Sequence, residues 1–322
     1  MQEVLSLSLT GLRRYLGRRA WMRSKVGRSP NHTMVPVTLR GRSIMVDQGD
    51  IEQFYLLTDC VREPENVFMY RALARSGLCR IFVDVGANYG HVALKVVDSY
   101  DRLVLVDANP HAAGFLRKLF AEDPNVSVHN VALVDGSDQK TVVLSVPENS
   151  SGLGSLNAQI AAGESVRQFE VQATTLDLLL HDMTNTPAYV KIDVEGLEDK
   201  VIAGGMNLRR RDNIIFGFEA LSREAAARCC DHFADHAFYF ARFDFLNPTG
   251  ALTKSMGGLL RAVAFGGSIR LYRFHGINDL TIDNFSQIIA VPRVLQASFE
   301  RAMHAYASKQ GNRIDLLGSS SQ

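Results

Sequence analysis

The residues best suited to chemistry begin within the last two positions of a short apolar run at residues 80–85 (RIFVDV). They form the segment DVGANYG, from Asp84 to Gly90, in which two glycines flank three other residues. Glycine lets the backbone turn sharply and approach a ligand closely. In doubly wound sheets, ligands bind at the carboxyl ends of the strands, beside a crossover. The segment therefore predicts a strand-to-helix turn that holds a small ligand.

The type of ligand follows from Asp84 and from the spacing of the glycines. The dinucleotide fingerprint G-x-G-x-x-G is absent. A pyrophosphate favours exposed backbone N–H groups without a nearby carboxylate, whereas an ammonium group favours an acid. The segment therefore favours S-adenosylmethionine over NAD as the cofactor, and an NAD-dependent oxidoreductase is the alternative.

A second acid, Asp107, ends the next apolar run, LVLVD. A carboxylate on the neighbouring strand tip can accept hydrogen bonds from both ribose hydroxyls of an adenosine ligand. NAD enzymes use an acid in the same way, so Asp107 indicates adenosine and not the reaction. The other interpretation is an acid that supports the helix beginning at Asn109-Pro110.

The third signal is the run KIDVEG, from Lys191 to Gly196, at the end of a later strand. Alternation places Lys191 and Asp193 on the same side of that strand. Asp193 and Glu195 are expected at its tip, facing the crevice. Charges in a central strand are costly to bury unless they are paired, so a structural Lys191–Asp193 pair is the competing interpretation.

Weaker candidates surround these segments. His91 lies on the first turn of the expected helix, Tyr89 precedes it, and Glu219 ends another strand. The Gly- and Ser-rich segment Ser151–Leu156 would fold over the substrate as a lid or form a surface loop.

Apolar strands that alternate with helices must position these residues. Such alternation predicts a doubly wound α/β sheet. Strands are expected at residues 35–39, 43–46, 80–85, 103–106, 126–131, 141–146, 168–171, 188–193, 214–219, 238–243 and 287–291. Helices are expected at 63–76, 90–99, from 110, 174–181, 196–203, 222–233 and 294–308.

Composition divides the chain into four predicted parts. These are a basic N-terminal extension (1–30), a cap of a hairpin and a helix (31–78), the catalytic domain (79–309) and a disordered tail (310–322). The extension interleaves Arg and Lys with leucines; a solvated segment is favoured over a helix on a membrane surface. A formal net charge of +1 does not favour nucleic acid as a partner. The oligomeric state is left open.

Four cysteines, Cys60, Cys79, Cys229 and Cys230, show no metal-binding spacing, and no metal is predicted. Their number suits free thiols in a reducing cytoplasm. No apolar run reaches the roughly 20 residues of a membrane-spanning helix.

With these residues together, the chain resembles the FkbM family of methyltransferases. The resemblance rests on FVDVGANYG (82–90), VDANP (106–110), NVAL (130–133), TTLD (174–177), VKIDVEGLE (190–198) and QIIAVP (287–292). It implies a Rossmann-like class I fold with a seven-stranded, mostly parallel sheet whose last strand is antiparallel. The chain departs from the family at Asp107, where glutamate is usual, and in the long stretch 247–274.

The resemblance also implies how the cofactor is held, with Asn130 and Val131 beside the adenine. The predicted cofactor-binding residues are Asp84, Gly86, Ala87, Asn88, Gly90, Asp107, Ala108, Asn130, Val131 and Asp193. The expected reaction is O-methylation of a hydroxyl on a small molecule or sugar.

A neutral hydroxyl needs a general base in that reaction. Asp193 is the first candidate, Glu195 the second and His91 the third. A nitrogen acceptor and a non-catalytic binding protein are alternatives that use the same pocket.

Overall fold

The computed structural model describes residues 33–47, 49–56, 64–136, 140–147, 166–183, 185–245, 267–275, 287–309 and 316–317. The predicted extension 1–30, the Ser151–Leu156 segment and Cys60 lie outside the described residues. Within the described ranges, no helix has the length and apolar character needed to span a membrane.

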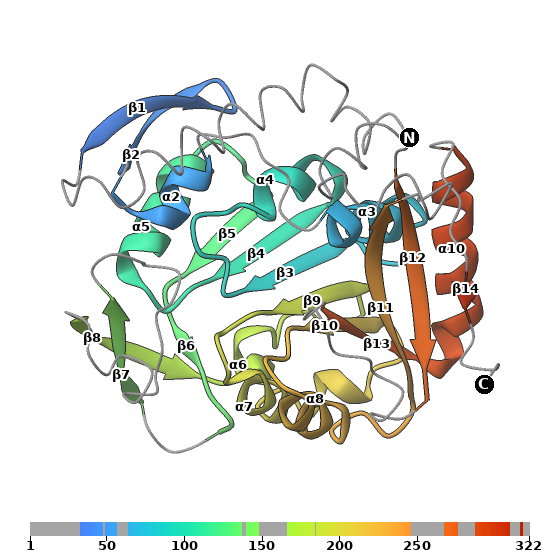
Figure 1. The fold of residues 1–322 in the computed structure, drawn as a ribbon. Coiled ribbons are helices and arrows are strands. Elements are labelled where there is room, and N and C mark those ends of the chain that lie inside the picture. Colours follow the sequence, from blue (N-terminus) through green and yellow to red (C-terminus); the bar gives the residue numbers. More distant parts are fainter. Residues whose placement is uncertain are drawn as a thin grey trace, which may run out of the picture.

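A nine-stranded sheet forms the centre of the molecule (Figure 1). Its strands, in spatial order, are β14 (Leu316–Leu317), β12 (Gly267–Phe274), β11 (His236–Phe245), β13 (Ile288–Pro292), β10 (Ile214–Phe218), β9 (Ala188–Ile192), β3 (Ile81–Val85), β4 (Arg102–Val106) and β5 (Val126–His129). The strands from β10 to β5 are parallel, and β13 is antiparallel to both neighbours, β10 and β11. The seven strands from β11 to β5 thus form the predicted doubly wound sheet.

Two further strands extend the sheet beyond the predicted seven. β12 pairs with β11 along its whole length, from Gly267 to Phe274. It belongs to the stretch 247–274, where Arg270 and Arg273 interrupt the apolar pattern, so the sequence indicated only a long connection. β14 pairs with β12 and lies within the segment 310–322, for which the sequence predicts disorder.

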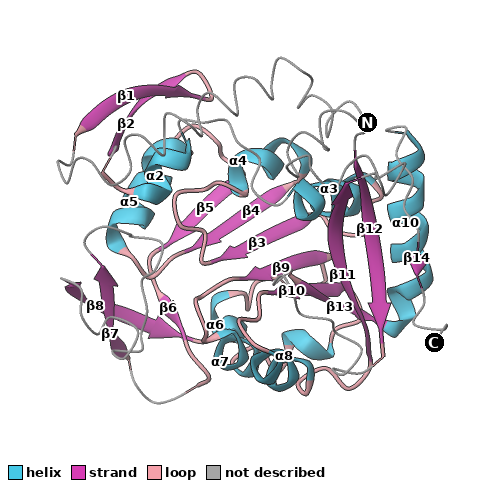
Figure 2. Ribbon diagram, in the orientation of Figure 1, coloured by secondary structure: helices cyan, strands magenta, loops and turns pink. Residues whose placement is uncertain are grey.

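Helices cover both faces of this sheet (Figure 2). One core contains side chains from α3 (Pro64–Arg75), α4 (Ala93–Val96), α5 (Pro110–Leu119), α10 (Gln296–Lys309) and the short 3-10 helix η1 (Val97–Ser99). The other contains side chains from α6 (Leu176–Leu179), α7 (Glu198–Ala203), α8 (Arg223–Cys230) and the 3-10 helix η3 (Leu208–Arg210). A third 3-10 helix, η5 (Arg293–Leu295), precedes α10. The central strands β3, β9, β10 and β13 are buried along their whole length, which explains their apolar sequences.

Polar residues begin several of these helices. The Asn109 side chain accepts a hydrogen bond from the His111 N–H, and Pro110 takes the first helical position of α5, as predicted. Thr175 caps α6 and Ser222 caps α8 in the same way. These local signals fix where each helix starts relative to the strand tip before it.

Helix α3, which falls in the predicted cap 31–78, packs against α10 and the central sheet. The ring of Phe68 lies 4.7 Å from that of Tyr306 on α10, and the ring of Tyr70 lies 5.0 Å from that of Phe82 on β3. The helix is therefore part of the layer that covers the sheet.

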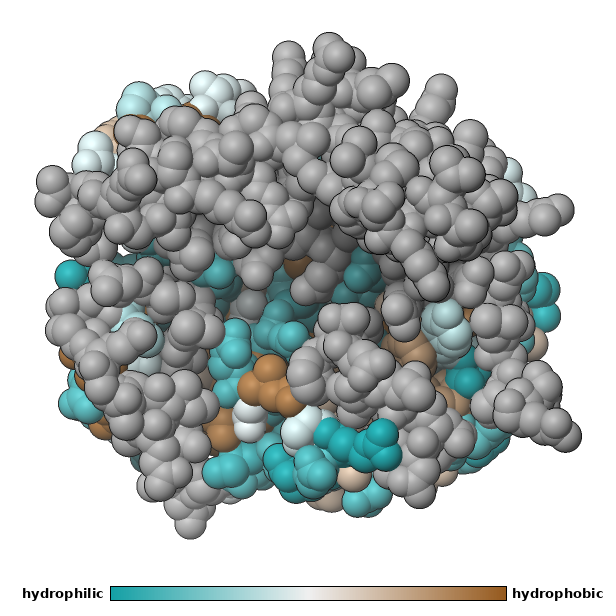
Figure 3. All heavy atoms as spheres, viewed as in Figure 1, coloured by the Kyte–Doolittle hydropathy of each residue, from teal (hydrophilic) through white to brown (hydrophobic). Residues whose placement is uncertain are grey.

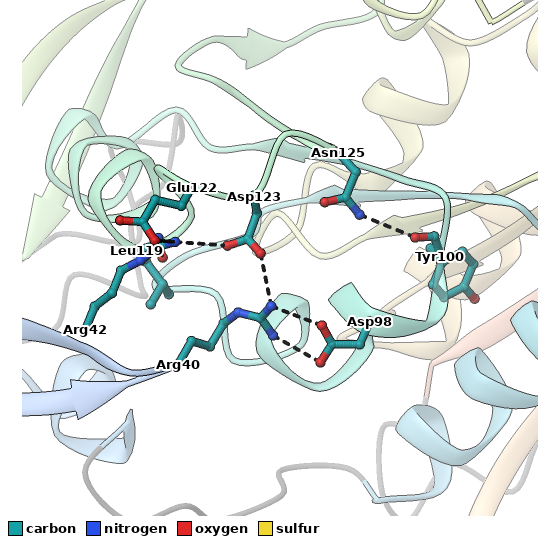
Figure 4. Close-up of polar contacts among 8 residues, drawn as sticks. All are labelled: Arg40, Arg42, Asp98, Tyr100, Leu119, Glu122, Asp123 and Asn125. Carbon is teal, nitrogen blue, oxygen red and sulfur yellow. Dashed lines mark hydrogen bonds and ion pairs between the residues drawn. The ribbon is translucent and has the colours of Figure 1, made fainter.

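A separate hairpin, β1 (Met34–Leu39) and β2 (Arg42–Asp47), leads into α2 (Ile51–Leu56). Its turn uses Arg40 at φ +51° and Gly41 at φ +78°. The Arg40 guanidinium binds Asp98 and Asp123 at 3.0 Å, and Arg42 binds Glu122 at 3.0 Å (Figure 4). These contacts hold the turn beside the segments that precede β4 and β5, while α2 follows at the other end of the hairpin.

A small three-stranded sheet has the order β6 (Ala132–Leu133), β8 (Val166–Thr174), β7 (Thr141–Pro147). β7 and β8 contain the predicted strands 141–146 and 168–171, and they pair antiparallel. In Figure 1 this sheet and the β1–β2 hairpin lie at the same side of the central sheet, one below and one above. In the space-filling view, the described residues visible between the hairpin and the small sheet are mostly hydrophilic, and a small hydrophobic group lies below them (Figure 3).

Candidate active site

A cavity of about 310 Å³ lies at the carboxyl ends of β3, β4, β9 and β10. The residues that line it come from the turns after these strands, from α2 and from the small sheet. They are Glu52, Asp84, Val85, Gly86, Ala87, Asn88, His91, Val92, Val106, Asp107, Ala108, Asn109, Val131, Ala132, Leu133, Leu144, Lys191, Asp193, Val194, Glu195, Leu197 and Glu219. Its volume falls at the lower end of the range of small-molecule sites.

Gly86 makes the turn after β3 possible. It has φ +77°, and a Cβ atom there would lie 1.7 Å from the backbone oxygen of Asp193. The N–H groups of Gly86 and Ala87 both donate to the Val106 carbonyl, and the Asp193 N–H donates to the Val85 carbonyl. Gly86 therefore makes the predicted sharp turn and also lets the tips of β3, β4 and β9 meet, a role that the sequence did not indicate.

Asp107 faces the cavity from the tip of β4. Its Oδ2 accepts a hydrogen bond of 2.7 Å from the Asn88 N–H, and its Oδ1 accepts one of 2.8 Å from the Asn109 N–H. Each carboxylate oxygen has a second lone pair for a ligand hydroxyl. Burial raises the pKa of Asp107 to about 6, against the lowering effect of the two backbone hydrogen bonds.

Two amide side chains beside Asp107 contain buried atoms that have no hydrogen-bond partner among the described residues. They are Oδ1 of Asn88 and Nδ2 of Asn109. Buried polar groups are almost always paired, so an acceptor and a donor at a cavity wall indicate a ligand with polar groups of both kinds. An adenosine moiety has such groups, and these residues therefore fit the predicted cofactor.

Lys191 lies between two carboxylates at the base of the cavity. Its Nζ atom is 3.3 Å from Oδ1 of Asp84 and 3.0 Å from Oδ2 of Asp193. The side chains of Lys191 and Asp84 are 5% and 1% exposed, whereas that of Asp193 is 30% exposed. The Lys191–Asp193 pair, which was the competing interpretation of the KIDVEG run, is present, and Asp84 joins it.

Glu52 and His91 meet on another wall of the cavity. The Nε2 of His91 lies 3.0 Å from the Glu52 carbonyl oxygen and 3.8 Å from its carboxylate. Asp50 holds the start of α2, because its carboxylate accepts hydrogen bonds from the Glu52 and Gln53 N–H groups. The sequence did not single out Glu52, although Asp50 before an apolar segment is a capping signal.

The structure brings most of the predicted site residues together. The three candidate bases, Asp193, Glu195 and His91, all line the cavity, as does Glu219. So do all the predicted cofactor residues except Gly90 and Asn130. Tyr89 is buried against Phe115, at 5.1 Å between ring centroids, and is not among the lining residues.

Gly90 and Asn130 are not among the lining residues, and both make structural contacts. Gly90 has φ +82°, and a Cβ atom there would lie 2.9 Å from a side-chain carbon of Leu116 on α5. The Asn130 side-chain amide donates to the carbonyls of Asp107 and Ala108, at 2.9 Å each. Both residues hold the turns that carry the lining residues.

Glu198 is a buried residue near the cavity that the sequence argument missed. Its carboxylate accepts hydrogen bonds from the N–H groups of Val194 and Gly196. Burial raises its pKa, which backbone hydrogen bonds oppose. An acid in the first turn of a helix, as Glu198 is in α7, is a local signal for a residue that interacts with backbone N–H groups.

Known families and solved structures include matches to this chain. The FkbM methyltransferase domain matches residues 84–246, about half of the chain. The comparison with curated proteins found no match. Several solved structures are similar at low identity, which carries no information on the acceptor.

The similar solved structures include the following three methyltransferases. A methyltransferase FkbM from Methylobacillus flagellatus is 11% identical, with a TM-score of 0.33, and the alignment covers 66% of this chain and 43% of that one. A precorrin-6y C5,15-methyltransferase from Geobacter metallireducens is 14% identical, with a TM-score of 0.34 and coverages of 69% and 87%. An O-methyltransferase from Bacillus cereus is 9% identical, with a TM-score of 0.35 and coverages of 74% and 84%.

The family match, together with the strand order, confirms the predicted class I methyltransferase fold and S-adenosylmethionine as the cofactor. The chain belongs to the FkbM family of methyltransferases.

Proposed function

We propose that this protein transfers the methyl group of S-adenosylmethionine to a hydroxyl group of a small molecule or sugar. The observation that carries the proposal is a single cavity shared by the Gly86 turn, the Asp107 carboxylate and the Asp84–Lys191–Asp193 group. S-adenosylmethionine supplies an electrophilic methyl group on a positively charged sulfur.

The residues of the cavity divide into two roles in this proposal. The Asp107 carboxylate accepts hydrogen bonds from the ribose hydroxyls, and Val131 lies beside the adenine. Asp84 provides negative charge for the ammonium group of the methionine moiety. The acceptor hydroxyl is aligned with the methyl group beside Asp193, Glu195 and His91. Such alignment lowers the activation barrier by about 7–11 kcal/mol in favourable cases.

The charge of the lining supports a small acceptor without phosphate groups. Six carboxylates line the cavity, those of Glu52, Asp84, Asp107, Asp193, Glu195 and Glu219. Lys191 is the one lysine or arginine among the described lining residues, and two of these carboxylates already hold its ammonium group. Phosphate-rich nucleic acid would be repelled from such a surface.

Calorimetry with S-adenosylmethionine and with NAD tests the cofactor, and a methyl-transfer assay on a panel of hydroxyl compounds tests the reaction. Binding of the sulfonium nucleoside, together with transfer to a neutral or amino-bearing hydroxyl compound, is the expected result. Binding of NAD alone would favour the oxidoreductase alternative. Cofactor binding without transfer to any acceptor would favour a binding protein.

Asp193→Asn tests the first candidate base. The amide retains the shape of the side chain but cannot accept a proton at neutral pH, so turnover is expected to fall by about 10² or more. The dissociation constant of the cofactor, measured by calorimetry, should change less than about threefold, since Asp84 and Asp107 remain. Full turnover in this variant would reject Asp193 and leave Glu195 and His91.

The raised pKa of Asp107 predicts a pH dependence of cofactor binding. The ionised carboxylate is the form that accepts both ribose hydroxyls, and a pKa of about 6 leaves it ionised at pH 7. As the pH falls below 6 the group becomes protonated, so the affinity at pH 5 should be roughly tenfold lower than at pH 7. Asp107→Asn should bind weakly at both pH values, with little difference between them. A wild-type affinity that is constant over this range would contradict the ribose role.

A further inference from the structure

The turn between β9 and α7 contains an unusual backbone conformation. Glu195 has φ +53°, in the left-handed region, and Gly196 follows at φ +97°. A residue that has a Cβ atom is strained in this region, whereas glycine is not. Three residues other than glycine show positive φ in the described chain. Arg40 is in the hairpin turn, whereas Asn88 and Glu195 both line the cavity.

Strain of this kind persists only where the surroundings impose it. The Glu198 side chain provides the constraint at Glu195. Its Oε1 accepts hydrogen bonds from the Val194 N–H at 3.0 Å and from the Gly196 N–H at 3.1 Å, so the peptide group before Val194 and the peptide group after Glu195 are held by one atom. Glu198 itself is 2% exposed and begins a helix whose Val201 and Ile202 are buried in the core.

The other end of the same turn is also held. The Asp193 N–H donates to the Val85 carbonyl, and the Asp193 carbonyl oxygen occupies the space that a side chain at position 86 would fill. Between these two fixed points, Val194 and Glu195 have little freedom. The turn therefore presents Asp193 and Glu195 to the cavity in one arrangement.

We propose that Glu198 is a positioning residue that holds Glu195 in its left-handed conformation, so that the Glu195 carboxylate faces the acceptor side of the cavity. This inference rests on the proposed function for its catalytic meaning, since Glu195 would contact the acceptor. The conformational link between the two residues can be tested by stability alone.

The first test compares Glu195→Gly with Glu195→Ala in the full-length chain. Both remove the carboxylate, but only glycine adopts positive φ without strain. We expect Glu195→Gly to raise the Tm by about 2–4 °C, as relief of roughly 1 kcal/mol would do. Glu195→Ala should leave the Tm unchanged or lower it. Both variants should transfer methyl groups at least tenfold more slowly than wild type. A lower Tm for Glu195→Gly than for Glu195→Ala would overturn the proposal.

The second test is a double-mutant cycle with Glu198→Ala and Glu195→Gly. If Glu198 acts by imposing the conformation of Glu195, the Tm loss from Glu198→Ala should differ by at least about 2 °C between the wild-type chain and the chain that already carries Glu195→Gly, because contacting residues couple. Equal Tm losses in the wild-type and Glu195→Gly chains would overturn the proposed link between Glu198 and Glu195.

Glu198→Gln is the conservative control, since its side-chain oxygen can still accept both hydrogen bonds. It should retain kcat within about threefold of wild type, whereas Glu198→Ala should lower kcat at least tenfold with the cofactor dissociation constant changed less than threefold. A loss of cofactor affinity without loss of kcat would instead assign Glu198 to cofactor binding. Wild-type protein that neither binds nor uses S-adenosylmethionine would reject the proposed function while the two Tm tests still decide the conformational link.

Discussion

Gly86→Ala is expected to abolish cofactor binding and to destabilise the fold by about 3 kcal/mol or more. Two effects add. An alanine at φ +77° has the backbone strain of the left-handed region, about 1–2 kcal/mol. Its Cβ would also lie 1.7 Å from the backbone oxygen of Asp193, so the tips of β3 and β9 must separate, and overpacking of this kind costs about 1–3 kcal/mol. The separation would displace the turns that carry Asp84 and Asp193.

Gly77 offers a matched control for this substitution. It has φ +74°, close to that of Gly86, but a Cβ atom there would meet nothing within 4 Å. Gly77→Ala should therefore show the backbone strain alone and should bind the cofactor normally. Urea unfolding measures the free energies and calorimetry the binding. Equal destabilisation of the two variants would show that the strand tips do not need their close approach.

Lys191→Met is expected to destabilise the protein by about 3–5 kcal/mol. The substitution removes the ammonium group that lies 3.3 Å from Asp84, whose carboxylate is 1% exposed. A buried ion pair that loses one partner leaves an uncompensated charge in a region of low dielectric constant, which has this typical cost. Asp193 is 30% exposed and can be hydrated, so most of the loss arises at Asp84.

The double variant Lys191→Met/Asp84→Asn separates charge from packing. It removes both ionic groups of the buried pair, so it should unfold at a higher urea concentration than Lys191→Met alone. Cofactor binding should remain weak, since the carboxylate proposed to face the ammonium group is lost. If the free energy of unfolding of Lys191→Met lies within about 1 kcal/mol of the wild-type value, Lys191 is not needed to stabilise the buried Asp84 carboxylate.

Local patterns were sufficient for all strands of the central sheet except β12 and β14, and for most of the residues that line the cavity. The buried strands are short apolar runs, and capping residues such as Asn109 mark where each turn ends. Asp84 is the penultimate residue of its run, and Asp107 and Asp193 follow theirs directly. The strand tips of a parallel sheet lie together, so the proximity of these residues could be predicted from the sequence.

The structural contacts that the sequence did not reveal join distant segments. A Cβ atom at Gly90 would meet the Leu116 side chain of α5. Asn130 supports the backbone at Asp107 through its side-chain amide. Glu52 lies in a helix whose position depends on the hairpin, and the hairpin turn is anchored by Arg40 about 60 residues before the segment it contacts. A local sequence pattern does not identify contact partners that are so far away in the chain.

The strand order has a consequence for how the chain acquires its structure during synthesis. β13 lies between β10 and β11, yet it is made last of the three, after residue 287. A nascent chain that ends at residue 246, where the family match also ends, therefore contains both flanking strands but not the strand that joins them. The ribosome must release more than forty further residues before the sheet can close, so the edges of β10 and β11 remain open to chaperones or to incorrect pairing until then.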